Sequence, residues 1–66
     1  MNIELMAKKL VALRGDKSRE EVARDNGISV SALAMYETGK RVPRDEIKLS
    51  LARYYGSSVE EIFFAS

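Results

Sequence analysis

The chain has 66 residues, of which 11 are basic and 10 acidic, and its formal net charge at pH 7 is +1. A chain of this length forms one small domain, residues 1–66, with little room for a deep catalytic cleft. It contains no cysteine and no histidine, which excludes disulfides, thiolate or imidazole metal sites and Ser-His catalysis. We therefore expect no enzymatic activity, no metal and no cofactor.

The longest uncharged run, residues 26–36, is much shorter than the roughly 20 apolar residues that a membrane-spanning helix needs. The N-terminal sequence lacks the basic-then-apolar order of a signal peptide. We expect a protein that does not span a membrane, and the absence of cysteine suits a reducing compartment.

Glycine, proline and serine divide the chain into five predicted helices. Each of the four glycines follows an apolar-periodic stretch, where a residue that tolerates positive φ can end a helix. Pro43 suits the first turn of a helix, and Ser18 and Ser58 each stand three residues before a glutamate, as in a capping box. These signals predict helices at residues 3–14, 19–26, 30–38, 44–55 and 59–64.

The apolar periodicity places one face of each long helix in a common core, and no strand-like alternation persists. The chain therefore reads as all-α. The predicted core residues are Met6, Leu10 and Leu13 in the first helix, Val22, Ala23, Ile28 and Leu33 in the middle, Ile47, Leu51 and Tyr55 in the fourth, and Val59, Ile62 and one of Phe63 and Phe64 in the last.

The second and third predicted helices have the residues that a steep crossing requires. Ala23 is small where two backbones meet, and Gly27 tolerates the positive φ of a tight connection. Ile28, Leu33 and Tyr36 then face inward, while the opposite side of the third helix stays free. This is the geometry of a helix-turn-helix, whose second helix enters a DNA major groove.

Three stretches, LRGDKSREEVARDNGIS, YETGKRVP and YYGSSVEEIFF, resemble the XRE-type regulators, relatives of the phage repressors and Cro. The likeness covers about residues 5–64 in the right order. It implies a five-helix, phage-repressor-like fold and a homodimer that binds a palindromic operator in double-stranded DNA. It also implies a regulator of transcription, most often a repressor, acting in the cytoplasm of bacteria or their phages and associated with the nucleoid.

The resemblance assigns base contacts to the third helix, but this helix carries no Arg, Asn or Gln between residues 29 and 37, the side chains that contact base edges bidentately. Either its apolar groups meet thymine methyls, with Val30 best placed, or the helix packs against another protein. The implied base-reading residues are Ser29, Val30, Ser31, Ala34 and Met35.

The resemblance also implies phosphate contacts by the cap of the second helix and the loop before the fourth. The loop charges are alternatively an ordinary solvated surface. Arg19 stands where the family usually has glutamine, and it is alternatively a partner of Glu20 or Asp16. The implied phosphate-binding residues are Ser18, Arg19, Lys40, Arg41 and Arg44.

Other matched positions concern structure. Arg14 and Glu37 correspond to a family pair that ties the first helix to the end of the third, so we expect an ion pair. They are alternatively two unrelated surface charges. Asn26 replaces a leucine and weakens the core unless it caps a helix. Ser57 replaces an aliphatic residue, which leaves the last helix without a hydrophobic staple to Ile62.

The C-terminal aromatic residues are candidates for a dimer interface. Tyr54 and Tyr55 cannot be equally buried, and we expect Tyr55 in the core. Only one of Phe63 and Phe64 fits the core, and the outward one forms a dimer patch with Ile62 or Tyr54. The alternative is an exposed phenylalanine near the terminus. The rival function is a protein-interaction module, such as an antitoxin or adaptor, that kept the fold without reading DNA.

Overall fold

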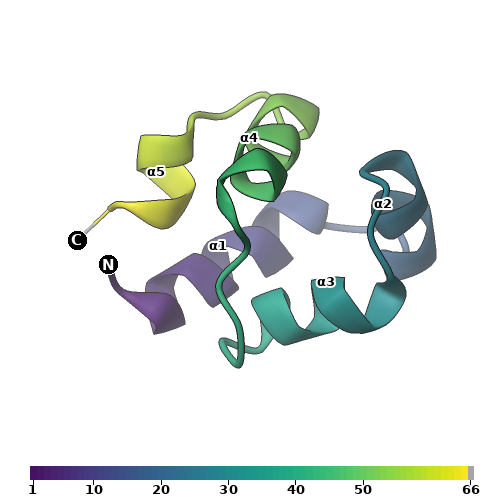
Figure 1. Ribbon diagram of the computed structural model, residues 1–66, viewed down its shortest axis with the longest axis horizontal. Coiled ribbons are helices and arrows are strands. Elements are labelled where there is room, and N and C mark those ends of the chain that lie inside the picture. Colours follow the sequence, from purple (N-terminus) through teal and green to yellow (C-terminus); the bar gives the residue numbers. More distant parts are fainter. Residues whose placement is uncertain (66) are drawn as a thin grey trace.

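The computed structural model describes residues 1–65, and this part of the chain folds into helices joined by short turns (Figure 1). The predicted all-α class with five helices is confirmed for these residues. None of these helices has the length and apolar character that crossing a membrane requires. They are α1 (Ile3–Arg14), α2 (Arg19–Asp25), α3 (Val30–Glu37), α4 (Asp45–Tyr54) and α5 (Val59–Phe63).

The observed boundaries differ from the predicted ones by one residue at most. Four residues predicted to be the last of their helices are instead C-cap residues: Asn26, Thr38, Tyr55 and Phe64. Helix α4 begins at Asp45, so Pro43 precedes the N-cap residue Arg44 and does not lie in the first turn. Pro43 has a fixed φ and no N–H to donate, so it restricts the backbone at the end of the loop.

Side-chain caps fix the starts of α1, α2, α3 and α5. In each case the side-chain oxygen accepts a hydrogen bond from the backbone N–H three residues later, at 3.0–3.1 Å. Such a cap is worth about 1 kcal/mol. The four N-cap residues are Asn2, Ser18, Ser29 and Ser58.

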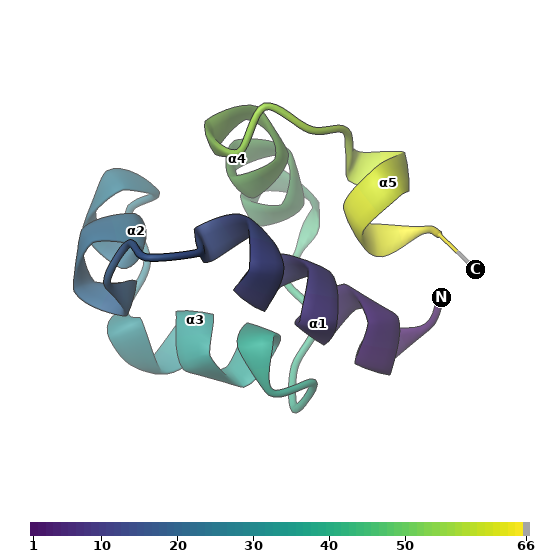
Figure 2. The ribbon, with the colours of Figure 1, turned by 180° about the vertical axis from the view of Figure 1, so that it is seen from behind.

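Helix α1 crosses the middle of the molecule and packs against both α3 and α5. Figures 1 and 2 show α3 on one side of it and α4 and α5 on the other, with α2 at one end. The core lies where these helices meet. Its largest fully buried side chains are Phe63, Met6, Leu10, Leu33, Leu51, Ile62 and Val22.

Leu13 departs from the predicted core. It follows the face of Met6 and Leu10, yet it is 37% exposed while they are fully buried. Leu13 lines a surface depression together with Ser57 and Ile62. Ser57 is too small to cover the leucine, so the last turn of α1 stays open to solvent.

Helix α5 resolves the choice between the two phenylalanines. Phe63 is buried to 1% exposure, while Phe64, beyond the helix end, is 56% exposed. Ile62 is also buried, at 2% exposure. Ile62 and Phe63, both assigned to a dimer interface, are thus almost wholly buried within the chain and offer little surface to a partner. The missing staple is replaced by a polar contact, in which the Ser57 hydroxyl donates to a Glu61 carboxylate oxygen at 3.2 Å.

Candidate nucleic-acid interface

Helices α2 and α3 form a compact helical pair around a tight turn. Gly27 has a φ of 66°, a left-handed value that an L-residue with a Cβ adopts at a cost of about 1–2 kcal/mol. The backbone N–H of Ile28 then donates to the Ala23 carbonyl at 3.0 Å. Ala23 and Leu33 are buried, at 1% and 0% exposure. Helices α2 and α3 therefore pack against each other through these residues, with Leu33 of α3 in the core.

Asn26 is the polar link between this pair and α4. Its side-chain amide donates to the Val22 carbonyl at 2.8 Å, and its side-chain oxygen accepts from the Ser50 hydroxyl at 2.7 Å. The residue also occupies the C-cap position of α2. A polar side chain is tolerated beside the core because both ends of its amide are bonded.

The outer side of α3 is exposed and mostly apolar. Val30 and Met35 are each 39% exposed, and Ser31 is exposed between them. Ala34 is half-buried, and Ser29 is exposed just before the helix. All five residues assigned to base reading therefore have side chains at or near one surface. In Figures 1 and 2 this helix forms an edge of the molecule, away from α4 and α5.

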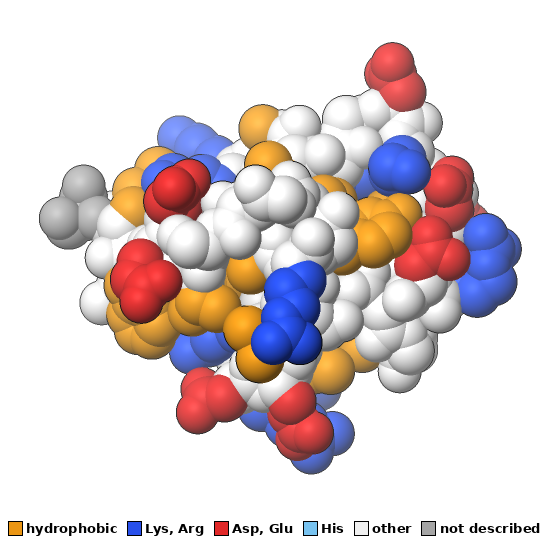
Figure 3. Space-filling model, turned by 90° about the horizontal axis from the view of Figure 1, so that it is seen from above, with side chains coloured by type: hydrophobic (Ala, Val, Ile, Leu, Met, Phe, Trp, Pro, Cys, Tyr) orange, Lys and Arg blue, Asp and Glu red, His pale blue; other side chains and the backbone are white. Residues whose placement is uncertain are grey.

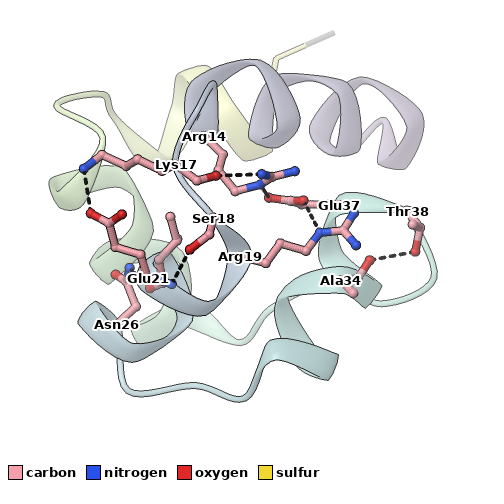
Figure 4. A network of polar contacts seen from close by, with 10 residues as sticks. Arg14, Lys17, Ser18, Arg19, Glu21, Asn26, Ala34, Glu37 and Thr38 are labelled. Carbon is pink, nitrogen blue, oxygen red and sulfur yellow. Dashed lines mark hydrogen bonds and ion pairs between the residues drawn. The ribbon is translucent and has the colours of Figure 1, made fainter.

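Three charged residues meet at the C-terminal end of α3, and we call this cluster the charged centre: Arg14, Arg19 and Glu37. The Glu37 side chain is fully buried, and its two oxygens accept from Arg14 Nε and Arg19 Nε, each at 2.8 Å. The expected pair between Arg14 and Glu37 is thus present, with a second arginine added. The hydrogen bond to Glu37 is the main cause that raises the pKa of Arg14. Figure 4 shows the carboxylate between the two guanidinium groups.

Arg19 pairs with neither Glu20 nor Asp16, the partners considered from the sequence. Its side chain extends from α2 toward the C-terminal end of α3, as Figure 4 shows. Over a third of the side chain, 37%, remains exposed. Within residues 1–65 only its Nε is hydrogen-bonded, so its terminal nitrogens are available to a ligand.

The loop between α3 and α4 presents basic side chains beside the outer face of α3. Lys40 and Arg41 are exposed, and within the described chain neither takes part in an ion pair. Their backbone N–H groups both donate to the Met35 carbonyl, at 2.9 and 3.3 Å, which ties the loop to the end of α3. Arg44 lies 3.8 Å from Glu46, with both side chains largely exposed. Such a solvated pair is weak.

Ser18 is less available than the other assigned phosphate contacts. Its hydroxyl oxygen already accepts from the Glu21 backbone N–H at 3.1 Å, as the N-cap of α2. The hydroxyl hydrogen is free to donate to an oxygen outside the chain. The cap and a phosphate contact are therefore compatible.

Tyr54 and Phe64, the remaining dimer candidates, contact different parts of the molecule. The Tyr54 hydroxyl donates to a carboxylate oxygen of Asp25 at 3.0 Å, so this ring faces α2. The Phe64 ring instead lies 4.9 Å from the ammonium of Lys48 in α4. The view in Figure 3 shows hydrophobic side chains in broken groups among charged ones. The structure does not join Tyr54 and Phe64 through a common contact.

Two features of this region escape the sequence analysis. The bond between Arg19 and Glu37 joins residues 18 positions apart. A signal for it exists, because a glutamate in the last turn of a helix opposes the helix dipole and needs cationic neighbours. The other feature is the Tyr55 hydroxyl, which is buried without a hydrogen-bond partner in residues 1–65. No sequence pattern indicates it.

Comparison with known proteins agrees with this geometry. A family model described as a helix-turn-helix domain matches residues 6–62, which is the larger part of the chain and agrees with the resemblance to XRE-type regulators. No curated protein and no solved structure matches the chain. Within residues 1–65 no group of three or more acidic side chains is arranged to hold a metal ion.

Proposed function

The chain belongs to the helix-turn-helix domain family, and from this membership we propose that it binds double-stranded DNA sequence-specifically and regulates transcription, as a repressor. One observation supports this most directly. The exposed side of α3 adjoins Lys40 and Arg41, which lack ion-pair partners within residues 1–65. Basic side chains without ion-pair partners can contact phosphates while the neighbouring exposed helix face enters a groove of duplex DNA. The proposed place of action is the nucleoid in the cytoplasm of a bacterium, or of a cell that carries a phage.

The proposed complex places α3 in the major groove. Its outer residues meet base edges, and the surrounding basic side chains hold the sugar-phosphate backbone. Base contacts come from Ser29, Val30, Ser31, Ala34 and Met35, and phosphate contacts from Ser18, Arg19, Lys40, Arg41 and Arg44. The phosphate contacts supply most of the affinity and make it depend on salt.

The proposed active form is a homodimer on a palindromic operator, with two α3 helices in successive major grooves about 34 Å apart. Among the residues predicted from the sequence to form a dimer interface, Phe64 best supports a homodimer, because it is 56% exposed. Tyr54 contributes less in this proposal, because its hydroxyl is bonded to Asp25. Phe64→Asp should therefore separate the subunits in sedimentation while the monomer stays folded.

The decisive experiment titrates the protein against a pool of random duplexes at several salt concentrations, and then against the tightest selected duplex. Arg41→Ala should weaken binding to every sequence alike and reduce the salt slope by about 0.9 for each bound subunit. Val30→Ala should instead reduce the difference in affinity between the selected duplex and random duplexes. Equal losses on all sequences for both variants would contradict this division of roles.

A second candidate function is a protein-interaction module, an antitoxin or adaptor. It is favoured by the absence of bidentate side chains from residues 29–37 and by the exposure of Val30 and Met35. This function would survive removal of the charges at Lys40 and Arg41 and would be lost in Phe64→Asp. Salt-dependent binding to duplex DNA, abolished by the loop substitutions, would decide against it.

A further inference from the structure

The outer face of α3 has few hydrogen-bonding groups left for a ligand. The Ser29 hydroxyl oxygen accepts from the Ala32 backbone N–H at 3.0 Å, which leaves its hydrogen as one donor at the start of the helix. The Thr38 hydroxyl donates to the Ala34 carbonyl at 2.8 Å. Glu37 is buried, with each of its oxygens bound to an arginine. Among exposed side chains within the helix, only the hydroxyl of Ser31 is both polar and free of bonds in residues 1–65.

Apolar atoms fill the rest of this face. Val30 and Met35 are each 39% exposed. On a helix, residues four apart are neighbours, so Val30 lies beside Ala34, and Ser31 beside Met35. The face is therefore two short rows of apolar groups, interrupted by one hydroxyl.

The basic side chains beside this face indicate the charge of the ligand that it binds. The terminal nitrogens of Arg19 lie toward the C-terminal end of α3, and Lys40 and Arg41 follow on the adjoining loop (Figure 4 shows Arg19). Cationic side chains beside an apolar face fit a polyanion that carries apolar groups between its charges. In the DNA major groove, the apolar group on a base edge is the C5-methyl of thymine.

We propose that α3 distinguishes DNA sequences by their C5-methyl groups, with Val30 and Met35 against the methyls and Ser31 making a single hydrogen bond. This inference rests on the proposed DNA-binding function and specifies its ligand as duplexes that display thymine methyls at the contacted positions. Cytosine methylated at C5 carries the same group in the same groove, so it belongs to the same ligand class.

Replacing thymine by uracil tests this directly, because it removes the methyl and leaves every base-edge hydrogen-bonding group in place. Burying one methyl group changes affinity roughly 4-fold. The duplex selected from the random pool should therefore lose roughly that factor for each contacted thymine when it is resynthesised with uracil. The measurement is fluorescence anisotropy at fixed salt, and a non-selected duplex with the same replacement should show no loss.

Four variants show which side chains cause the methyl effect. Val30→Ala and Met35→Ala should each reduce the penalty for uracil, because fewer side-chain atoms meet the methyl. Arg41→Ala and Ser31→Ala should weaken binding to the thymine and uracil duplexes by the same factor and keep the full penalty. Circular dichroism checks that each variant is folded, which is expected because all four side chains are exposed.

The outcomes separate this inference from the proposed function. Binding that selects a sequence but is indifferent to uracil would overturn the methyl readout and leave DNA recognition standing. The same holds if Val30→Ala and Met35→Ala both keep the full penalty. Absence of salt-dependent binding to any duplex in the pool would overturn both proposals. A further gain in affinity when a contacted cytosine carries a C5-methyl would support the inference.

Discussion

Both sides of α3 carry apolar side chains, but only the inner side packs them into the core, where Leu33 and Tyr36 are 0% and 6% exposed. The inner side buries the only charged residue of the helix, Glu37, whose side chain is fully buried between two arginines. The outer side exposes Val30 and Met35, each by 39%. A typical amphipathic helix buries its apolar face and exposes its charges. The outer side of α3 departs from this pattern. Core packing and the charged centre together hold α3 in place, so the outer side is left free for a ligand.

This difference makes stability and recognition separable within a single helix. A buried ion pair contributes little net free energy, yet loss of one partner is strongly destabilising because the other charge is left behind. An exposed apolar side chain contributes little to folding, because it is not fully removed from water. Substitutions on the two sides of α3 should therefore differ in what they affect.

The largest effect is expected for Glu37→Ala. It leaves Arg14 and Arg19 facing each other without the carboxylate, and Arg14 is only 18% exposed. We expect the free energy of unfolding to fall by about 3 kcal/mol, measured by urea denaturation followed by circular dichroism. The matched control is Glu21→Ala, which removes the exposed pair with Lys17 and should change stability by less than about 0.5 kcal/mol. Similar losses in both variants would contradict the structural role of the charged centre.

Arg19→Ala should have an intermediate effect on folding, because Glu37 keeps its bond to Arg14. The Arg19 side chain is 37% exposed, so solvent weakens its pair, and we expect a loss of about 1 kcal/mol. If Arg19 also contacts phosphate, the salt slope of DNA binding should fall by about 0.9 for each bound subunit. Arg19→Gln is the matched control, since it keeps an uncharged donor. Retention of the full salt slope in both variants would remove Arg19 from the phosphate contacts.

Met35→Ala tests the outer side of the same helix. Alanine favours helix formation slightly, and the side chain is exposed, so stability should change by no more than about 0.5 kcal/mol. The discrimination between selected and random duplexes should fall nonetheless. A loss of stability near that of Glu37→Ala would show that the two sides of α3 are not separable, contrary to the comparison above.

The helices were predictable because their signals are local. Ser18 and Ser58 cap helices over three residues of sequence, and the tight turn between α2 and α3 needs only Gly27. These contacts form within one turn of the chain, so a short window of sequence contains the whole signal. The buried side of each helix, set by apolar spacing, was predictable for the same reason.

What the sequence left open depends on residues distant in the chain. The inward choice of Phe63 over Phe64, and the burial of Ile62, follow from how α5 packs on α1 and α4. Leu13 fits the apolar period of α1 but lines an open depression that Ser57 does not fill. In the candidate interface, a phosphate contact by Arg19 was predicted from the resemblance, but the bond of Arg19 to Glu37 was not. Such pairings require the helices to be placed first.

The smallest effect concerns Tyr55, which lies close enough to the charged centre for Glu37 and Arg14 to influence the pKa of its hydroxyl. That pKa is raised from an ordinary value of 10.0 to about 12, mainly by burial, and the charge of Glu37 also raises it while that of Arg14 lowers it. The folded state therefore favours the neutral phenol. The stability that the folded protein gains from keeping the Tyr55 phenol neutral is fully present below pH 10 and is lost as the pH rises from 10 to 12.

Tyr55→Phe removes this titration together with a buried hydroxyl that has no hydrogen-bond partner in residues 1–65. At pH 7 we expect a gain in unfolding free energy between zero and about 0.5 kcal/mol, since an unsatisfied polar group is replaced by an apolar ring of the same shape. Urea midpoints of both proteins at pH 7, 9 and 11 then measure the difference. It should stay constant up to pH 9 and widen at pH 11 in favour of the variant. A constant difference across this range would show that the Tyr55 phenol is solvated in the folded protein. Water would then reach the inner side of α3, although the Glu37 carboxylate there is fully buried.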